Sequence, residues 1–185
     1  MQIIATMLPD VLVIEPKVHG DPRGFFLETF QAPRYAAAGI HRPFVQDNLS
    51  RSARGVLRGL HLQNPRPQGK LVTVLRGSVR DVAVDVRLGS PTFGHHVEVL
   101  LTDENRRQLW VPRGFAHGFA VLSESADFFY KCDDLYSPEN ETIIAWDDPD
   151  IGIKWDVDAP VVSARDAAGV RLKDLAEVLP KYGLV

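Results

Sequence analysis

Residues Lys70 to Arg87 read KLVTVLRGSVRDVAVDVR. Before the short link Arg76-Gly77-Ser78, leucine and threonine alternate with valine, and after it valines alternate with aspartate and alanine. Alternation of this kind is typical of β-strands, in which successive side chains point to opposite faces. Because a short link that contains glycine often closes a hairpin, we expect the two runs to pair with each other as a β-hairpin.

Short β-type runs continue along the rest of the chain, with Gly, Pro, Asn or Asp in the turns between them. They cover residues 97–101, 108–111, 119–122, 128–131 and 142–146, and the apolar stretch 1–16 also reads as strand. Helix signals are confined to residues 33–38 and 173–179. This pattern predicts a mainly all-β fold, and we expect a single domain over residues 1–185: a cupin-type double-stranded β-helix, or jelly roll, with short flanking helices.

The 185 residues are an ordinary length for one globular domain, and 45% of them are hydrophobic. The net charge of −3 gives no overall attraction to nucleic acid or to an anionic membrane, so an anionic ligand needs a local basic cluster. Cys132 is the single cysteine, which excludes an internal disulfide and a CxxC zinc site. Because no apolar run approaches the roughly 18 residues of a membrane span, we expect a soluble cytoplasmic protein.

The segment VLRGLHLQ, residues 56–63, places a guanidinium and an imidazole near each other. Strand alternation separates Arg58 from the face of His61 unless Gly59 allows a β-bulge, whereas His61 and Gln63 share a face. In a partly dry cavity His61 would be a natural general base, and Lys70 could stabilise an oxyanion beside it. The alternatives are a histidine without a role and a solvated lysine at a strand end.

The segment PRGFAHGF, residues 112–119, has the P-x-G-x-x-H spacing of the second cupin motif, in which a glycine turn leads into a strand with an inward histidine, here His117. A metal-binding cupin adds an H-x-H in its first motif, but the first motif of this chain reads His61-Leu62-Gln63. Since the second imidazole ligand is missing, we expect no catalytic metal.

Two further residues suit proton transfer. Tyr130 lies in an apolar run, either as a core aromatic whose hydroxyl bonds to the backbone or as a proton donor opposite His61. Asp166, in the sequence SARD at 163–166, reads as a loop acid or a helix cap. Sequence alone does not bring Asp166 to His61.

Several motifs occur in the same order as in a known enzyme family. They are DPRGFFLE at 21–28, FVQDN at 44–48, VLRGLHLQ at 56–63 with GKLV at 69–72, GSPTFG at 89–94, GFAHGF at 114–119 and YSPE at 136–139. Together they resemble the dTDP-4-dehydrorhamnose 3,5-epimerases over nearly the whole chain. The resemblance implies a jelly roll that works as a homodimer, with no metal or other cofactor, on a dTDP-linked 4-keto-6-deoxy sugar.

The resemblance also implies roles for single residues. His61 matches the proton-abstracting base, and Asp166 matches the acid that pairs with it. Tyr130 matches the proton donor, and Lys70 matches the lysine beside the keto oxygen. Residues that match positions holding the nucleotide or sugar are Arg23, Phe26, Glu28, Gln46, Asp47, Asn48, Arg58, Lys70, His117, Tyr136, Glu141 and Arg165, of which Tyr136 matches the aromatic that stacks on thymine.

The chain departs from the family pattern in a few places. Arg165 stands where the family often has a lysine near the diphosphate, and this change keeps the cation. Leu62 replaces an aromatic, and the pair Cys132-Asp133 replaces small or hydroxyl residues. We expect these last departures to lie outside the site.

The reaction expected from the resemblance inverts carbons 3 and 5 of dTDP-4-keto-6-deoxy-D-glucose through an enolate. It lies on the route to dTDP-L-rhamnose for surface polysaccharide such as the O-antigen of lipopolysaccharide. Three alternatives stay open: a relative that inverts one centre in a deoxysugar pathway, a metal-dependent cupin enzyme, and a sugar-nucleotide sensor. The combination of an acid and a base favours an enzyme over a sensor, because a passive binder needs neither.

Overall fold

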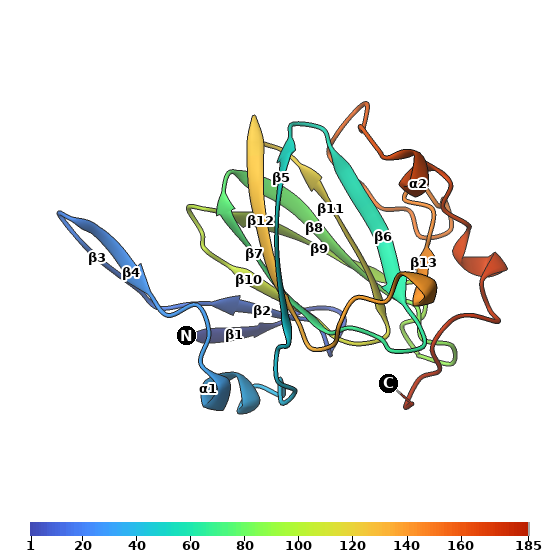
Figure 1. The fold of residues 1–185 in the computed structure, drawn as a ribbon, viewed down its shortest axis with the longest axis horizontal. Coiled ribbons are helices and arrows are strands. Elements are labelled where there is room, and N and C mark those ends of the chain that lie inside the picture. Colours follow the sequence, from blue (N-terminus) through green and yellow to red (C-terminus); the bar gives the residue numbers. More distant parts are fainter. Residues whose placement is uncertain (185) are drawn as a thin grey trace.

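Two antiparallel sheets face each other in the computed structural model, which describes residues 1–184 (Figure 1). In hydrogen-bonded order, the first sheet holds β1 (Gln2–Ala5), β2 (Leu12–Glu15), β10 (Gln108–Val111), β7 (Lys70–Arg76), β12 (Ser125–Cys132) and β5 (Gln46–Ala53). The second sheet holds β13 (Glu141–Ile143), β6 (Leu57–Gln63), β11 (Phe115–Val121), β8 (Ser78–Asp85) and β9 (His96–Thr102). This arrangement confirms the predicted jelly roll of mainly β structure.

The expected hairpin over residues 70–87 is wrong, although both of its strands exist. β7 belongs to the six-stranded sheet and pairs with β10 and β12, whereas β8 belongs to the five-stranded sheet and pairs with β9 and β11. The chain passes from one sheet to the other at Gly77, whose φ is +80°. A Cβ at this position would collide with the carbonyl oxygen of Ser125, so the corner needs glycine. Alternation predicted the strands correctly but carries no information about their partners.

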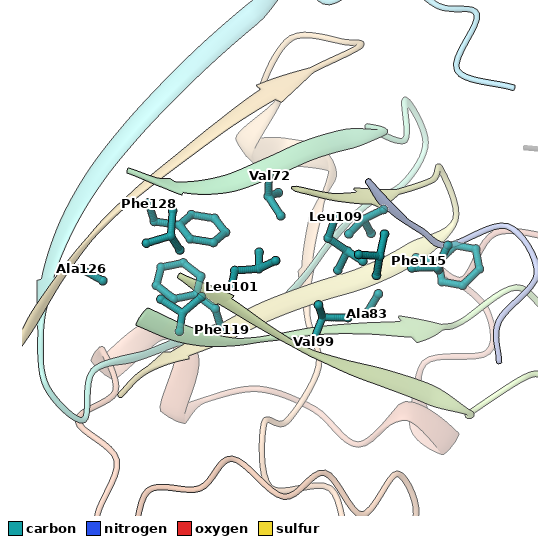
Figure 2. Close-up of a cluster of buried hydrophobic side chains, with 14 of the residues drawn as sticks. Val72, Ala83, Val99, Leu101, Leu109, Phe115, Phe119, Ala126 and Phe128 are labelled. Atoms are coloured by element: carbon teal, nitrogen blue, oxygen red, sulfur yellow. The ribbon is translucent and has the colours of Figure 1, made fainter. Parts of the chain in front are cut away.

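Apolar side chains from both sheets meet in the space between them. Val72 and Phe128 come from the six-stranded sheet, and Ala83 and Phe119 come from the other (Figure 2). The rings of Phe119 and Phe128 stack with their centroids 4.0 Å apart. This core fills part of the interior and leaves the inward positions near Lys70 and His61 to polar residues.

A second apolar cluster lies on the outer side of the five-stranded sheet. Leu57, Leu60 and Val84 point outward there and pack with Ile144 and Trp155 of the carboxy-terminal segment. In Figure 1 this segment, drawn in orange and red, runs along the side of β6 and β13 and carries the short helix α2 (Ala164–Ala167). The packing fixes the segment that brings Asp166 to β6.

The helix predictions are half right. α1 (Ala32–Ala36) confirms the predicted helix over residues 33–38, and Gly39, with φ of +93°, follows its end. The helix predicted over residues 173–179 does not form: only a single 3₁₀ turn, Leu172–Asp174, stands there. Another 3₁₀ turn, Pro138–Asn140, precedes β13.

A hairpin that the alternation did not predict extends away from the two sheets. β3 (Val18–Asp21) and β4 (Gly24–Leu27) pair only with each other and project to one side of the molecule (Figure 1). Phe25 and Phe26 on this hairpin are largely exposed. Among residues 1–184, no helix combines the length and hydropathy needed to cross a membrane.

Candidate active site

A β-bulge in β6 gives Arg58 and His61 a common face. His61 lies opposite His117 of β11, and Arg58 lies opposite Phe119, so three steps along β6 match two steps along β11. Gly59 takes up the extra residue with φ of +121°, and a Cβ there would lie only 2.6 Å from the Cα of Gly118. Arg58 and His61 were expected to share a face only if Gly59 allowed a β-bulge, and the structure has this bulge.

His61 is bonded to Asp166. Its Nε2 lies 2.8 Å from the carboxylate Oδ1, and the His61 side chain is 30% exposed while that of Asp166 is 6% exposed. Ser163 caps the first turn of α2, since its Oγ accepts the Asp166 N–H at 3.0 Å. The predicted cap thus belongs to Ser163, and the turn that it starts aims Asp166 at His61.

Opposing effects act on the carboxyl group of Asp166. Burial raises its pKa, but hydrogen bonds from His61, from the Gly59 backbone and from Ser163 outweigh the burial, so the pKa lies below its usual value. Asp166 is therefore ionised at neutral pH, and the tautomer that suits it carries the proton on Nε2 and donates this N–H to the carboxylate. Nδ1 of the neutral ring is then the nitrogen with a free lone pair.

Lys70, Tyr130 and Cys132 share the inward face of the six-stranded sheet. Cys132 pairs with Lys70 on one side and with Gln46 on the other, and Tyr130 stands two residues before Cys132 on the same face. Cys132, which we expected to lie outside the site, therefore stands next to Lys70 and near Tyr130. Its Sγ accepts a hydrogen bond from Asn48 Nδ2 at 3.7 Å.

Burial shifts the pKa values of this row of groups. It lowers the pKa of the Lys70 ammonium, an effect that the thiol of Cys132 and the carboxylate of Asp81 oppose. It raises the pKa of the Tyr130 hydroxyl and raises that of the Cys132 thiol to about 11. Tyr130 therefore keeps its proton at neutral pH, as a proton donor must.

A second histidine–carboxylate pair lies deeper in the interior. His117 Nε2 is 3.0 Å from Oδ1 and 3.1 Å from Oδ2 of Asp81, which is fully buried. The imidazole stacks on the ring of Phe128, with the two ring centroids 6.1 Å apart. The inward direction predicted for His117 is correct. Sequence reasoning missed Asp81, although an acid between the valines of a buried strand was a signal for a partnered interior charge.

Tyr136, Glu141 and Arg165 form a cluster beyond the end of β6. The Tyr136 hydroxyl donates to Glu141 Oε2 at 2.9 Å, and Arg165 forms an ion pair with Glu141 and donates to the Tyr136 hydroxyl at 3.4 Å. Glu141 pairs across the strands with Gln63, two residues from His61. Three residues predicted to hold the nucleotide or sugar thus lie together next to the His61 strand.

The inward face of β5 contributes amides rather than charges. Gln46 and Asn48 lie on this half-buried face, and Gln46 Nε2 donates to Asn48 Oδ1 at 3.1 Å. Asp47 points to the opposite, exposed face and binds Lys131 there at 2.8 Å. Of the predicted run at residues 46–48, the structure therefore brings two residues toward the interior and turns the third away.

Arg23, Phe26 and Glu28 do not reach His61 within this chain. The Arg23 side chain is 90% exposed at the tip of the β3–β4 hairpin, where it binds Asp21 at 2.6 Å, and Phe26 is 71% exposed. Glu28 follows the hairpin and binds Arg34 at 2.8 Å. All three belong to the projecting part of the chain rather than to the interior of the jelly roll.

The residues at the positions that bind metal in a metal-binding cupin make other bonds in this structure. The Gln63 amide bonds to three backbone groups, and the Nε2 atoms of His61 and His117 each face a carboxylate. Over residues 1–184, no group of three or more His, Cys, Asp or Glu side chains is arranged to hold a metal ion. An amide that is already bonded to the backbone therefore stands where a metal-binding cupin has its second imidazole.

Comparisons with known proteins agree on one family. The family model described as dTDP-4-dehydrorhamnose 3,5-epimerase matches residues 5–174. A dTDP-4-dehydrorhamnose 3,5-epimerase of Pseudomonas aeruginosa is 52% identical over 176 residues, which are 94% of this chain and 97% of the relative.

Solved structures of the same fold extend this likeness. The dTDP-6-deoxy-D-glucose-3,5-epimerase of Legionella pneumophila, in complex with dTDP-4-keto-L-rhamnose, superposes with a TM-score of 0.96 at 56% identity and 98% coverage of both chains. A 3'-monoepimerase of Streptomyces bikiniensis, in complex with dTDP-quinovose, has a TM-score of 0.90 at 34% identity, covering 96% of this chain and 92% of its own. With a family model over most of its length and a relative at half identity, this chain belongs to the dTDP-4-dehydrorhamnose 3,5-epimerase family.

Proposed function

We propose that this protein converts dTDP-4-keto-6-deoxy-D-glucose into dTDP-4-keto-L-rhamnose by inverting carbons 3 and 5, one step of dTDP-L-rhamnose biosynthesis. The observation that carries the proposal is the pair formed by His61, on the inward face of β6, and Asp166 of α2. The ketone at carbon 4 acidifies the hydrogens at carbons 3 and 5, because either carbanion delocalises onto oxygen as an enolate. Inversion therefore needs a base, a charge beside that oxygen and an acid on the other face of the sugar.

His61 is the base in this proposal. Because the Asp166 carboxylate bonds to Nε2, Nδ1 takes the proton from carbon, and the imidazolium that forms is stabilised by the buried carboxylate. Since carbons 3 and 5 both flank the ketone, the same imidazole can serve each centre in turn.

Lys70 and Tyr130 supply the other two functions. In this proposal the Lys70 ammonium lies beside the enolate oxygen and stabilises its negative charge. Tyr130 lies on the sheet opposite His61 and holds its proton, so it returns a proton from the other face and inverts the centre. Arg58 shares the face of His61 and donates to Ser52 Oγ at 3.1 Å, near the sugar.

The nucleotide end of the substrate is assigned to the cluster of Tyr136, Glu141 and Arg165. The ring of Tyr136 is partly exposed and can stack on thymine, and the guanidinium of Arg165 suits a diphosphate. Gln46 and Asn48 on β5 lie near this cluster, where the Gln46 amide bonds to Asn48 and to the Tyr136 backbone. His117 lies on the strand next to His61, where it is bonded to Asp81.

We infer that the protein works as a homodimer. The three predicted binding residues of the hairpin region, Arg23, Phe26 and Glu28, lie away from His61 in their own chain, so a second copy is the nearest candidate to receive them. The outer face of the six-stranded sheet also offers an apolar cavity of about 290 Å³ beside Leu75 and Phe129. An elution mass of two chains in light scattering supports this inference, and a monomer that is fully active contradicts it.

The protein is further proposed to act as one domain in the cytoplasm, with its product feeding surface polysaccharide such as the O-antigen of lipopolysaccharide. The lone buried thiol of Cys132 suits a reducing compartment. The dTDP-linked sugar itself is a soluble intermediate, which fits a substrate taken from solution.

Proton NMR of metal-free protein with dTDP-4-keto-6-deoxy-D-glucose in heavy water tests the function. Deuterium at carbons 3 and 5 with the L-rhamno product supports the double epimerase. Exchange at one centre alone favours a single-centre epimerase instead. The likeness to the Streptomyces bikiniensis 3'-monoepimerase supports this alternative. Activity that a chelator abolishes and a metal restores favours a metal-dependent cupin enzyme, and binding of substrate without exchange favours a sensor.

A further inference from the structure

The backbone that carries Tyr136 is bound by the side chains of three glutamines. Each residue of the segment Asp134–Ser137 has one backbone group bonded to a glutamine amide. The bonds run from Gln68 Nε2 to the Asp134 carbonyl (2.8 Å), from Gln63 Nε2 to the Leu135 carbonyl (3.2 Å), from the Tyr136 N–H to Gln46 Oε1 (2.9 Å) and from the Ser137 N–H to Gln63 Oε1 (2.8 Å). We call Gln46, Gln63 and Gln68 the glutamine cradle.

The cradle draws on three separate parts of the fold. Gln46 lies in β5 of the six-stranded sheet, Gln63 lies in β6 of the five-stranded sheet, and Gln68 lies in the link between β6 and β7. The segment is thus tied to both sheets, although it belongs to neither. Its position is fixed relative to His61, which shares the inward face of β6 with Gln63.

Gln63 is the centre of the cradle. It is 6% exposed, and its Nε2 also donates to the Arg66 carbonyl at 2.5 Å, so the amide bonds to three backbone groups. Both donor hydrogens and the acceptor oxygen are engaged. A side chain of the same shape without the amide would leave buried backbone groups unpaired, which is costly.

Tyr136 has little conformational freedom, because both its backbone and its side chain are bound. Its backbone N–H is bound by Gln46 and its hydroxyl is bound by Glu141, and yet the residue remains 46% exposed. Loops usually satisfy such backbone groups with water and stay mobile. An aromatic ring that is both exposed and held in place is a preorganised stacking surface, because a ligand need not order it on binding.

We propose that the glutamine cradle positions Tyr136 to receive the base of the nucleotide, with Gln63 as its central positioning residue. This inference rests on the proposed function only in taking Tyr136 as the stacking residue. Gln63 touches neither the reacting carbons nor the ketone in this account. It contributes to nucleotide affinity and leaves the rate of proton exchange in the bound complex largely unchanged.

The competing reading places Gln63 in the chemistry, because it stands two residues from His61 on the same strand face. The two readings differ in which quantity changes. Loss of the cradle weakens the binding of dTDP alone, which has no reacting sugar. Damage to the base slows exchange at saturating substrate and leaves dTDP binding intact.

The test compares Gln63→Met with Asn105→Leu. Asn105 also bonds three backbone groups, those of Leu100, Thr102 and Arg107, but in the turn between β9 and β10, so its loss costs a similar set of bonds elsewhere. For Gln63→Met we expect dTDP binding, measured by calorimetry, to weaken about tenfold or more, with exchange at saturating substrate within about threefold of wild type. Asn105→Leu should keep wild-type dTDP affinity.

A double-mutant cycle with Tyr136→Ala makes the test specific. If the cradle acts through Tyr136, Gln63→Met adds almost nothing to the loss of affinity once Tyr136 is alanine. If Gln63→Met does not fold, Gln68→Met, which removes one bond at a half-buried position, should weaken dTDP binding in the same direction by a smaller factor.

Three results overturn the proposal: unchanged dTDP affinity in folded Gln63→Met, equal losses with and without the Tyr136 ring, or a fall in exchange as large as the fall in affinity. Failure of the proposed function looks different. In that case the wild-type protein performs no exchange, while the effect of the cradle on dTDP binding can still be measured.

Discussion

The imidazole of His61 and the carboxylate of Asp166 stand 105 positions apart in the sequence and 2.8 Å apart in the structure. The link between them is the carboxy-terminal segment, where Val161 forms a parallel bridge with Val56 just before β6. The pair therefore exists only when that segment is packed on the outer side of the five-stranded sheet. With His61 as the proposed base, catalysis requires the complete fold.

Replacing Asp166 with asparagine tests its partnership with His61. Asp166→Asn keeps the size of the side chain but removes the charge that stabilises an imidazolium and sets the ring tautomer, so we expect deuterium exchange to slow by about 100- to 10,000-fold. Affinity for dTDP should not change, because in the proposed mechanism the carboxylate acts on His61 rather than on the nucleotide. Asp158→Asn, at an exposed position near the same segment, is the control. A near-normal exchange rate in folded Asp166→Asn would show that His61 works without it.

Tyr130→Phe separates proton removal from proton return. The variant retains His61 and Lys70, so the carbon–hydrogen bonds can still be broken, but the opposite face has lost its donor. We expect deuterium to enter the substrate with configuration retained, while inversion slows by about 100-fold or more. Proton NMR resolves exchange from inversion in one experiment. Inversion at the wild-type rate would assign the donor to another group.

Cys132 is expected to resist alkylation in the folded protein. Burial raises the pKa of its thiol to about 11, so almost none of it is the reactive thiolate at about pH 8, and the residue is 1% exposed. Mass spectrometry after iodoacetamide treatment should find it unmodified until denaturant is added. Rapid labelling of native protein that dTDP prevents would instead mark Cys132 as an accessible, activated thiol of the site.

Asp85 gives a stability prediction that depends on pH. Burial raises the pKa of its carboxyl, but bonds from Arg87, Ser90 and Thr92 outweigh this and bring the value from 3.8 to about 2. A carboxyl whose pKa is lower in the folded state stabilises the protein above its unfolded pKa and loses that effect as the pH falls. We expect this part of the stability to be about 1–2 kcal/mol above about pH 5, and to disappear between about pH 4 and pH 2.

Urea unfolding of wild type and Asp85→Asn over this pH range measures that effect. The difference in unfolding free energy between the two proteins should be constant near neutral pH and should shrink below about pH 4. A difference that stays the same down to about pH 2 would mean that the Asp85 pKa is not depressed in the folded protein.

Local pattern was sufficient to predict strands but not the partners of those strands. β10 has the bounds that its alternation indicates, and the runs in β7, β8 and β12 were also recognised. The chain then crosses between sheets at Gly77, a long-range choice that alternation does not encode. β5 was missed for a different reason: its inward face carries polar side chains, because that face lines the site rather than the apolar core.

The candidate site could likewise be predicted only in part from the sequence. The bulge at Gly59 and the inward direction of His117 follow from the local sequence, so Arg58 and His61 could be placed on one face as a stated possibility. Contacts that join distant segments, such as Asp81 with His117 and Cys132 with Lys70, depend on which strands pair within each sheet, and alternation does not determine that pairing. Those contacts cannot be predicted without the strand order of the two sheets.

The most direct test of the account measures exchange at both carbons in His61→Ala, with His95→Ala, an exposed histidine, as control. Each rate is followed by proton NMR in heavy water with saturating dTDP-4-keto-6-deoxy-D-glucose. If His61 serves both centres, exchange at carbons 3 and 5 falls together by about 100-fold or more, while the control exchanges normally. Continued exchange at either carbon at the wild-type rate would contradict the account, because a different base would then be removing that proton.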